Sequence, residues 1–128
     1  MTSRVVGIVV THGSLGKELV RTAETIIGPQ DGIEIISNTG ASLQGLSEDL
    51  GRLILDHPDA PLCLFVDLIG GSCGIVCQEV LRIRPDAAVF SGINLPMILE
   101  FFHYRDRVGL PELRERLVTR GRDGIRSL

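Results

Sequence analysis

The sequence contains no tryptophan, one tyrosine and one lysine, and it has no long apolar run. No apolar stretch approaches the ~20 residues that a membrane-spanning helix needs. The first four residues, Met1 to Arg4, lead straight into an apolar run of strand length and lack the features of a secretion signal. We therefore expect a cytoplasmic protein that is not inserted in a membrane.

Positive charge is also sparse. Twelve arginines and one lysine are scattered among sixteen acidic residues, so that the net charge is -3 and the isoelectric point is about 5.5. No broad basic surface is available to attract phosphate backbones, which argues against a nucleic-acid partner. The three cysteines are odd in number and form no secreted disulfide pattern, so we expect reduced thiols.

What the sequence does contain is a regular alternation of strand and helix patterns, which we assign to one domain of residues 1–128. Its 128 residues, 44% of them hydrophobic, suffice for one core and are too few for two ordinary domains. The strands are expected at 5–10, 33–37, 62–66 and 87–91, and the helices at 15–27, 43–54, 72–83, 95–104 and from 111 until Gly121 and Gly124, with 125–128 unassigned. The pattern predicts an α/β fold: a three-layer, doubly wound domain with a mostly parallel four-stranded sheet.

Polar residues follow the predicted strands. Ligands and chemistry gather beyond the carboxyl ends of parallel strands, where the sequence places His12, Asp67 and Asn94. Imidazole titrates near neutrality and can act as a nucleophile while a carboxylate holds its other ring nitrogen. We take His12 as the candidate nucleophile and Asp67 as its holder. A turn at His12 and a helix cap at Asp67 explain the same spacing equally well.

Small residues beside these two positions suit an anion. Gly70, Gly71 and Ser72 precede a helix, where backbone N–H groups and a hydroxyl can bind phosphate, and Gly13 and Ser14 do so after His12. An ordinary loop with a helix cap is the alternative. Neither segment matches the dinucleotide or Walker A pattern, which argues against nucleotide binding.

Two further features have competing interpretations. Cys73 and Cys77 share a helix face and, with His12, allow a metal site or a thiol nucleophile, but small core residues explain them better because no second cysteine pair has zinc spacing. We therefore expect no metal ion and no cofactor. The apolar segment from Met97 to Tyr104 fits core packing and also a subunit interface.

Four segments in this order carry a family likeness over nearly the whole chain: Thr11-His12-Gly13, Val66-Asp67 with Gly70-Gly71-Ser72, Gly92-Ile93-Asn94-Leu95-Pro96-Met97, and Gly121-Arg122-Asp123-Gly124. They resemble the mannose-type enzyme IIA (EIIA) domain of the phosphoenolpyruvate-dependent sugar phosphotransferase system (PTS). The family often has a hydroxyl residue and an aromatic after the aspartate and a proline after the serine. Here those positions hold Leu68, Ile69 and Cys73.

The resemblance implies a phosphotransferase component with a phosphohistidine at His12, whose ring Asp67 orients, and with Ser72 lining the phosphate pocket. It implies that a histidine-containing phosphocarrier protein donates the group and that an enzyme IIB (EIIB) protein accepts it for carbohydrate uptake. It also implies an additional antiparallel C-terminal strand that is exchanged in a homodimer. We expect a stand-alone EIIA domain that acts in trans, because neither an Ala/Pro-rich linker nor an EIIB domain follows.

Other functions fit the same residues. A regulatory PTS protein would signal through phosphorylation of His12, and a flavodoxin-like module would bind a small ligand without phosphotransfer. The related phosphotransfer subunit of a dihydroxyacetone kinase ranks lower, because the Asn94 to Met97 and Gly121 to Gly124 segments favour the mannose type.

Overall fold

The four strands lie in one parallel sheet in the order β2-β1-β3-β4. The computed structural model describes residues 4–128. The strands are β1 (Val6–Thr11), β2 (Ile33–Ser37), β3 (Leu62–Val66) and β4 (Ala88–Phe90). Val10 of β1 is in register with Val66 of β3, so the carboxyl ends of the two central strands lie level with each other.

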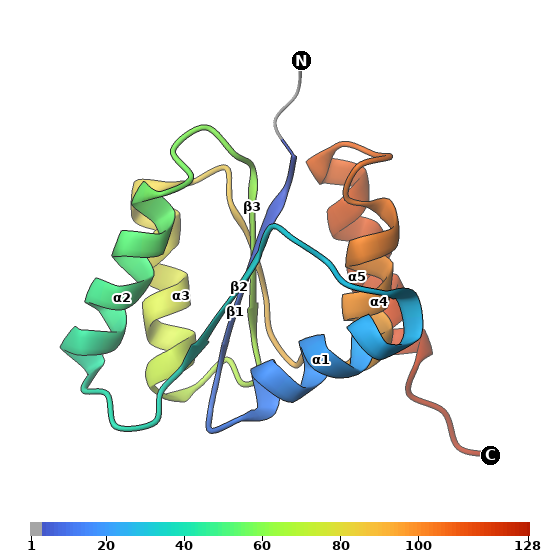
Figure 1. Cartoon of the computed structure of the whole chain (residues 1–128), viewed down its shortest axis with the longest axis horizontal. Helices are drawn as coiled ribbons and strands as arrows, with labels where there is room; N and C mark the ends of the chain where they lie inside the picture. The colour runs from blue at the N-terminus through green and yellow to red at the C-terminus, as the bar shows by residue number, and fades with distance from the viewer. Residues whose placement is uncertain (1–3) are drawn as a thin grey trace.

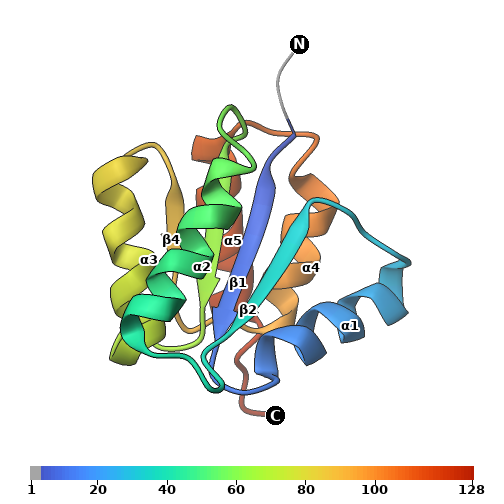
Figure 2. The same ribbon diagram turned by 60° about the vertical axis from the view of Figure 1, so that its left-hand side comes forward.

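Five helices cover the sheet on both faces. They are α1 (Leu15–Ile27), α2 (Leu43–Leu55), α3 (Gly71–Ile83), α4 (Leu95–Tyr104) and α5 (Leu110–Asp123). Helices α2 and α3 lie on one face, and α1, α4 and α5 lie on the other, as Figure 1 and Figure 2 show. This arrangement confirms the predicted three-layer, doubly wound α/β fold.

The central strands are buried on both sides, which explains their continuous apolar sequences. On β1, Ile8 and Val10 pack toward α2 and α3, whereas Val9 packs toward α1, α4 and α5. On β3, Leu64 and Phe65 divide between the two faces in the same way. Alternate side chains therefore belong to two separate cores, one on each face of the sheet.

The apolar segment of α4 belongs to the second core. Met97, Ile98, Phe101 and Phe102 are buried there, and Phe101 packs edge-on against Phe65 at 5.1 Å between ring centroids. This favours core packing over a subunit interface for these side chains. Among the described residues, no helix combines the length and the apolar character needed to span a membrane.

The helix ends differ in detail from the predicted ones. Ser14 occupies the N-cap of α1 but makes no side-chain cap bond, and the buried Thr11 hydroxyl instead accepts from the Gly16 N–H at 2.7 Å. Helix α3 begins at Gly71, one residue early. Helix α5 runs through Gly121 to Asp123, because the helix packs there against Met97. In the described chain, residues 125–128 form neither helix nor strand, and the exchanged C-terminal strand stays a prediction.

Candidate functional site

The candidate site lies where the strand order of the sheet reverses. The chain passes from β1 to β2 on one side and later from β3 to β4 on the other, so the loops after β1 and β3 diverge from adjacent strands. His12 directly follows β1, and Asp67 directly follows β3. Strand pairing therefore brings together two residues that are 55 positions apart in the sequence.

Asp67 contacts His12 through a single carboxylate oxygen. Its Oδ2 accepts from the His12 backbone N–H at 3.0 Å and lies 2.9 Å from ring Nδ1, while its Oδ1 accepts from the Leu68 N–H at 3.0 Å. Burial of the carboxyl raises the pKa of Asp67, but the hydrogen bonds from His12 and Leu68 and the attraction of the imidazole outweigh it and hold the pKa below its ordinary value. An ionised carboxylate only accepts, so Nδ1 carries the proton in this pair.

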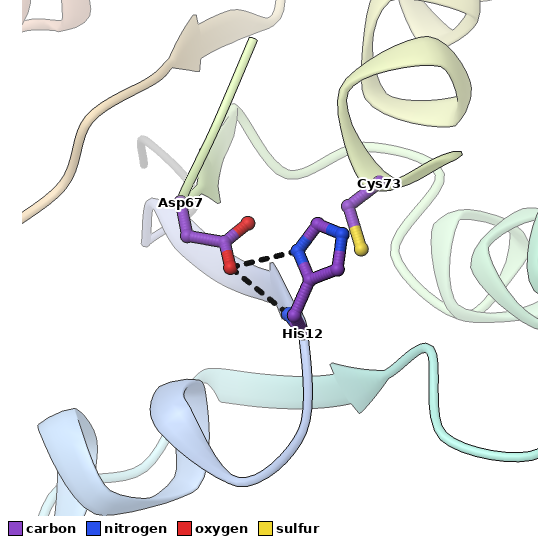
Figure 3. Close-up of side chains that lie close together, drawn as sticks. All are labelled: His12, Asp67 and Cys73. Atoms are coloured by element: carbon purple, nitrogen blue, oxygen red, sulfur yellow. Dashed lines mark hydrogen bonds and ion pairs between the residues drawn. The ribbon is translucent and has the colours of Figure 1, made fainter. Parts of the chain in front are cut away.

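The second ring nitrogen, Nε2, is left free for chemistry. Figure 3 shows it on the side of the ring away from Asp67 and toward the start of α3. A Cβ placed on Gly71 would lie 3.6 Å from Nε2, so the absence of a side chain there leaves the nitrogen open. Gly71 has φ +79°, a conformation that also favours glycine. The His12 side chain is 43% exposed, which allows a partner to reach it.

The start of α3 lies beside this nitrogen, since a Cβ on Gly71 would be 3.6 Å from it. The first N–H groups of a helix have no acceptor within it, and no side chain caps α3 at Gly70. Their partial positive charge favours an anion. Gly74 fixes the approach of this helix to the preceding loop, because a Cβ there would lie 2.0 Å from the Ile69 carbonyl oxygen. The structure thus brings Gly71 to His12, with Gly70 and Ser72 on either side of it.

The arrangement matches a known family. A family model described as the fructose IIA component of the PTS matches residues 7–118. The chain belongs to the mannose-type EIIA family. It is 30% identical over 125 residues to the mannose-specific EIIAB component of Escherichia coli K12, covering 94% of this chain and 38% of that protein. The chain thus spans little more than a third of the length of the curated relatives it matches.

Solved structures share the fold of this EIIA chain. A phosphotransferase system component EIIA from Streptococcus agalactiae superposes with a TM-score of 0.88 at 25% identity, covering 96% of both chains. The mannose/sorbose-specific IIA subunit from Enterococcus faecalis gives 0.86 at 22% identity, covering 100% of this chain and 96% of that one. At 22% identity, the likeness to the Enterococcus faecalis subunit shows a shared fold only.

Gly13 and Ser14, the other two predicted anion ligands of this EIIA chain, lie on the opposite loop. The Gly13 N–H is donated to the Asn38 side-chain oxygen at 3.1 Å, and the Gly13 carbonyl accepts from the Ser37 hydroxyl at 2.7 Å. Ser14 is exposed. The loop after β2 therefore holds the His12 loop in place, a role for Asn38 that sequence reasoning missed.

Asn94, the third residue predicted at a strand end, does not join the pair. Its side-chain oxygen accepts from the Met97 N–H at 3.1 Å, which caps the first turn of α4. Its amide nitrogen donates to the Gly121 carbonyl at 2.8 Å. Asn94 thus ties α4 to α5 and serves the packing of the helices.

The two cysteines of α3 have different surroundings. Cys77 lies in the core, where burial raises the pKa of its thiol to about 12. Cys73 is buried too, but its Sγ lies near the His12 ring (Figure 3). Burial and the Asp67 carboxylate raise the pKa of the Cys73 thiol, against a hydrogen bond from Ser72. The i, i+4 spacing signalled one shared face but not which thiol reaches the site.

Proposed function

We propose that this chain is a phosphoryl carrier of the PTS, which accepts a phosphoryl group on Nε2 of His12 from a histidine-containing phosphocarrier protein and passes it to an EIIB partner for sugar uptake. The observation that carries the proposal is the 2.9 Å contact between Nδ1 of His12 and Asp67, because it leaves Nε2 free beside the start of α3. Family membership supports the same chemistry.

The chemistry follows from the roles of the two ring nitrogens. The Nε2 lone pair attacks phosphorus, a new P–N bond forms, and the P–N bond to the donor imidazole breaks with its electron pair returning to the donor. Asp67 keeps Nδ1 protonated and stabilises the positive charge that develops on the His12 ring. The proposed donors to the phosphoryl oxygens are the N–H groups at the start of α3 and the Ser72 hydroxyl. Attack by EIIB on phosphorus reverses these steps.

The test is incubation with labelled phosphoenolpyruvate, enzyme I and the phosphocarrier protein. The wild-type chain should acquire label that is acid-labile and base-stable, as expected for phosphohistidine. His12→Ala should acquire none and should keep its circular dichroism spectrum, because the residue lies in a loop. His57→Ala and His103→Ala are matched controls, since both histidines lie outside the site, and both should take up label.

Full labelling of His12→Ala would show that His12 is not the phosphorylated residue. If the wild-type chain takes up no label and a small molecule co-purifies with it, the chain is a ligand-binding module. Transfer onward to an EIIB protein, scored in a second step, separates a transport component from a regulatory one.

We propose in addition that the chain acts in the cytoplasm and as a symmetric homodimer. The family resemblance supports the dimer, and so does the edge of the sheet, since β4 pairs with β3 on one side only within the described residues. A strand from a second copy would satisfy the N–H and carbonyl groups along that edge. Light scattering should give twice the chain mass, and a monomer at high concentration contradicts the dimer.

A further inference from the structure

We propose that His12 and Cys73 form a site for a thiophilic divalent metal ion, with Zn²⁺ the best match, and that the bound ion occupies the same nitrogen that accepts the phosphoryl group. His12, Asp67 and Cys73 each place one ligand atom so that the three lie within 4.8 Å of one another. Figure 3 shows the Cys73 sulfur beside the ring and Asp67 on its opposite side.

The donor set suits zinc in particular. Zn²⁺ binds imidazole nitrogen at about 2.0–2.1 Å and thiolate sulfur at about 2.3 Å, so the two ligand atoms of a bound ion lie about 3.5 Å apart. The ligand atoms of the cluster lie within 4.8 Å of one another, so zinc binding requires the imidazole nitrogen and the sulfur to move closer together. Hard cations such as Mg²⁺ prefer oxygen ligands and match this nitrogen and sulfur pair poorly.

Asp67 supplies the hydrogen-bond acceptor that normally contacts the second ring nitrogen of a zinc-bound histidine. Its Oδ2 holds Nδ1 at 2.9 Å, which fixes the tautomer with Nε2 unprotonated and available as a ligand. The 43% exposure of the His12 side chain leaves room for water to complete the coordination. The ion therefore has two protein ligands, His12 and Cys73, and Asp67 orients the His12 ring.

The other thiols are excluded by their positions. Cys77 lies one helical turn further along α3, and its thiol is not among the ligand atoms that gather around His12 in the described residues. Cys63 lies within β3 and packs in the opposite core. Only Cys73, near the start of α3, shares a ligand cluster with His12 in the part of the chain that the structure describes.

A metal ion at Nε2 and a phosphoryl group at Nε2 exclude each other, because both use the same lone pair. Zinc would thus hold the carrier in its unphosphorylated form. This consequence rests on the proposed function, whereas metal binding itself does not.

The test begins with the reduced, chelator-treated and unphosphorylated full chain, titrated with Zn²⁺ alone by calorimetry and with Co²⁺ as a spectroscopic probe. We expect one ion per chain and, with Co²⁺, the near-ultraviolet charge-transfer absorption of a thiolate ligand. Cys73→Ser and His12→Ala should each weaken binding by at least about tenfold and remove this absorption. Asp67→Asn should weaken binding by about 10–100-fold. Cys77→Ala and Cys63→Ala are matched controls and should bind as the wild type does.

Wild-type affinity in Cys73→Ser, or Co²⁺ binding without thiolate absorption, overturns the site. If Cys73→Ser does not fold, the wild-type absorption and the two control cysteine variants still decide whether the thiolate is Cys73. In a separate arm, each protein is scored for the ratio of phosphoryl label with and without Zn²⁺. Zn²⁺ should reduce the phosphoryl label of the wild type and of Cys77→Ala more than that of Cys73→Ser. A chelator should restore the label. Absence of label in every sample contradicts the proposed function and leaves the binding result standing.

Discussion

Oδ2 of Asp67 holds His12 at two points, the backbone N–H at 3.0 Å and ring Nδ1 at 2.9 Å. One contact anchors the loop, and the other sets the orientation of the ring. Because the backbone bond holds Oδ2 in place, a turn of the ring away from Asp67 would break the Nδ1 contact. The carboxylate is thus well placed to orient a nucleophile.

We predict that Asp67→Asn slows phosphoryl transfer by on the order of 10²–10⁴-fold. The amide keeps the shape of the carboxylate and can accept from the His12 backbone N–H, but it no longer stabilises positive charge on the ring and can favour the wrong tautomer. The variant should stay folded, with only a small loss of stability at neutral pH. Rapid-quench measurement of transfer from the phosphocarrier protein decides the point, and a rate near wild type would show that Asp67 only caps the loop.

The pKa of Asp67 also predicts a dependence of stability on pH. Its folded pKa lies below the ordinary value of 3.8, so the ionised form stabilises the fold above about that pH, and this contribution is lost as the pH falls through the folded pKa. The difference in unfolding free energy between wild type and Asp67→Asn should therefore be present at pH 7 and shrink in acid. Urea unfolding at several pH values measures it. The exposed Asp59→Asn variant is the control, and a difference that grows in acid contradicts the prediction.

Gly71→Ala should impair the site and strain the backbone. The residue has φ +79°, where an alanine costs about 1 kcal/mol, and the added methyl group would lie 3.6 Å from Nε2 of His12. We expect a lower melting temperature and slower phosphoryl transfer. Gly70→Ala is the matched control, because Gly70 has φ -85° and open space around its Cβ position. Equal effects of the two substitutions would argue against a special role for position 71.

Arg105 stabilises the end of the sheet opposite the candidate site. Its side chain has no exposed surface and donates to the carbonyls of Asp31 at 2.6 Å and Gly32 at 3.2 Å, which fixes the turn that leads into β2. Arg105→Met should lower the free energy of unfolding by about 2 kcal/mol, because it removes the Arg105 donor from the Asp31 carbonyl and one of the two donors from the Gly32 carbonyl. The Gly32 carbonyl also accepts from the Gly7 N–H. Phosphoryl transfer should persist in the folded protein. Urea unfolding and the labelling assay together check this, with the exposed Arg107→Met as control.

Much of the fold could be read from local patterns. The apolar runs ending at Val10 and Val66 predicted buried strands because a strand covered on both faces has no polar side to show. The position of His12 after one strand and of Asp67 after another predicted that both lie at the same edge of a parallel sheet. Asn94 satisfied the same local rule, yet it caps a helix instead, because a strand end alone does not decide where a side chain turns.

The sequence by itself determined the order of the strands and helices, the glycines that flank the site, and the chemistry that a histidine and a carboxylate can perform. Only the tertiary structure decided which of these residues meet. Pairing of β1 with β3 brought Asp67 to Nδ1 of His12. Both cysteines of α3 pack in the core, but the position of the start of α3 brought only Cys73 close to the His12 ring in the described residues. Helical periodicity predicts that the two thiols lie on one face of α3, but it does not predict how far each lies from His12. That distance depends on where the helix begins relative to the end of β1, which only the tertiary structure decides.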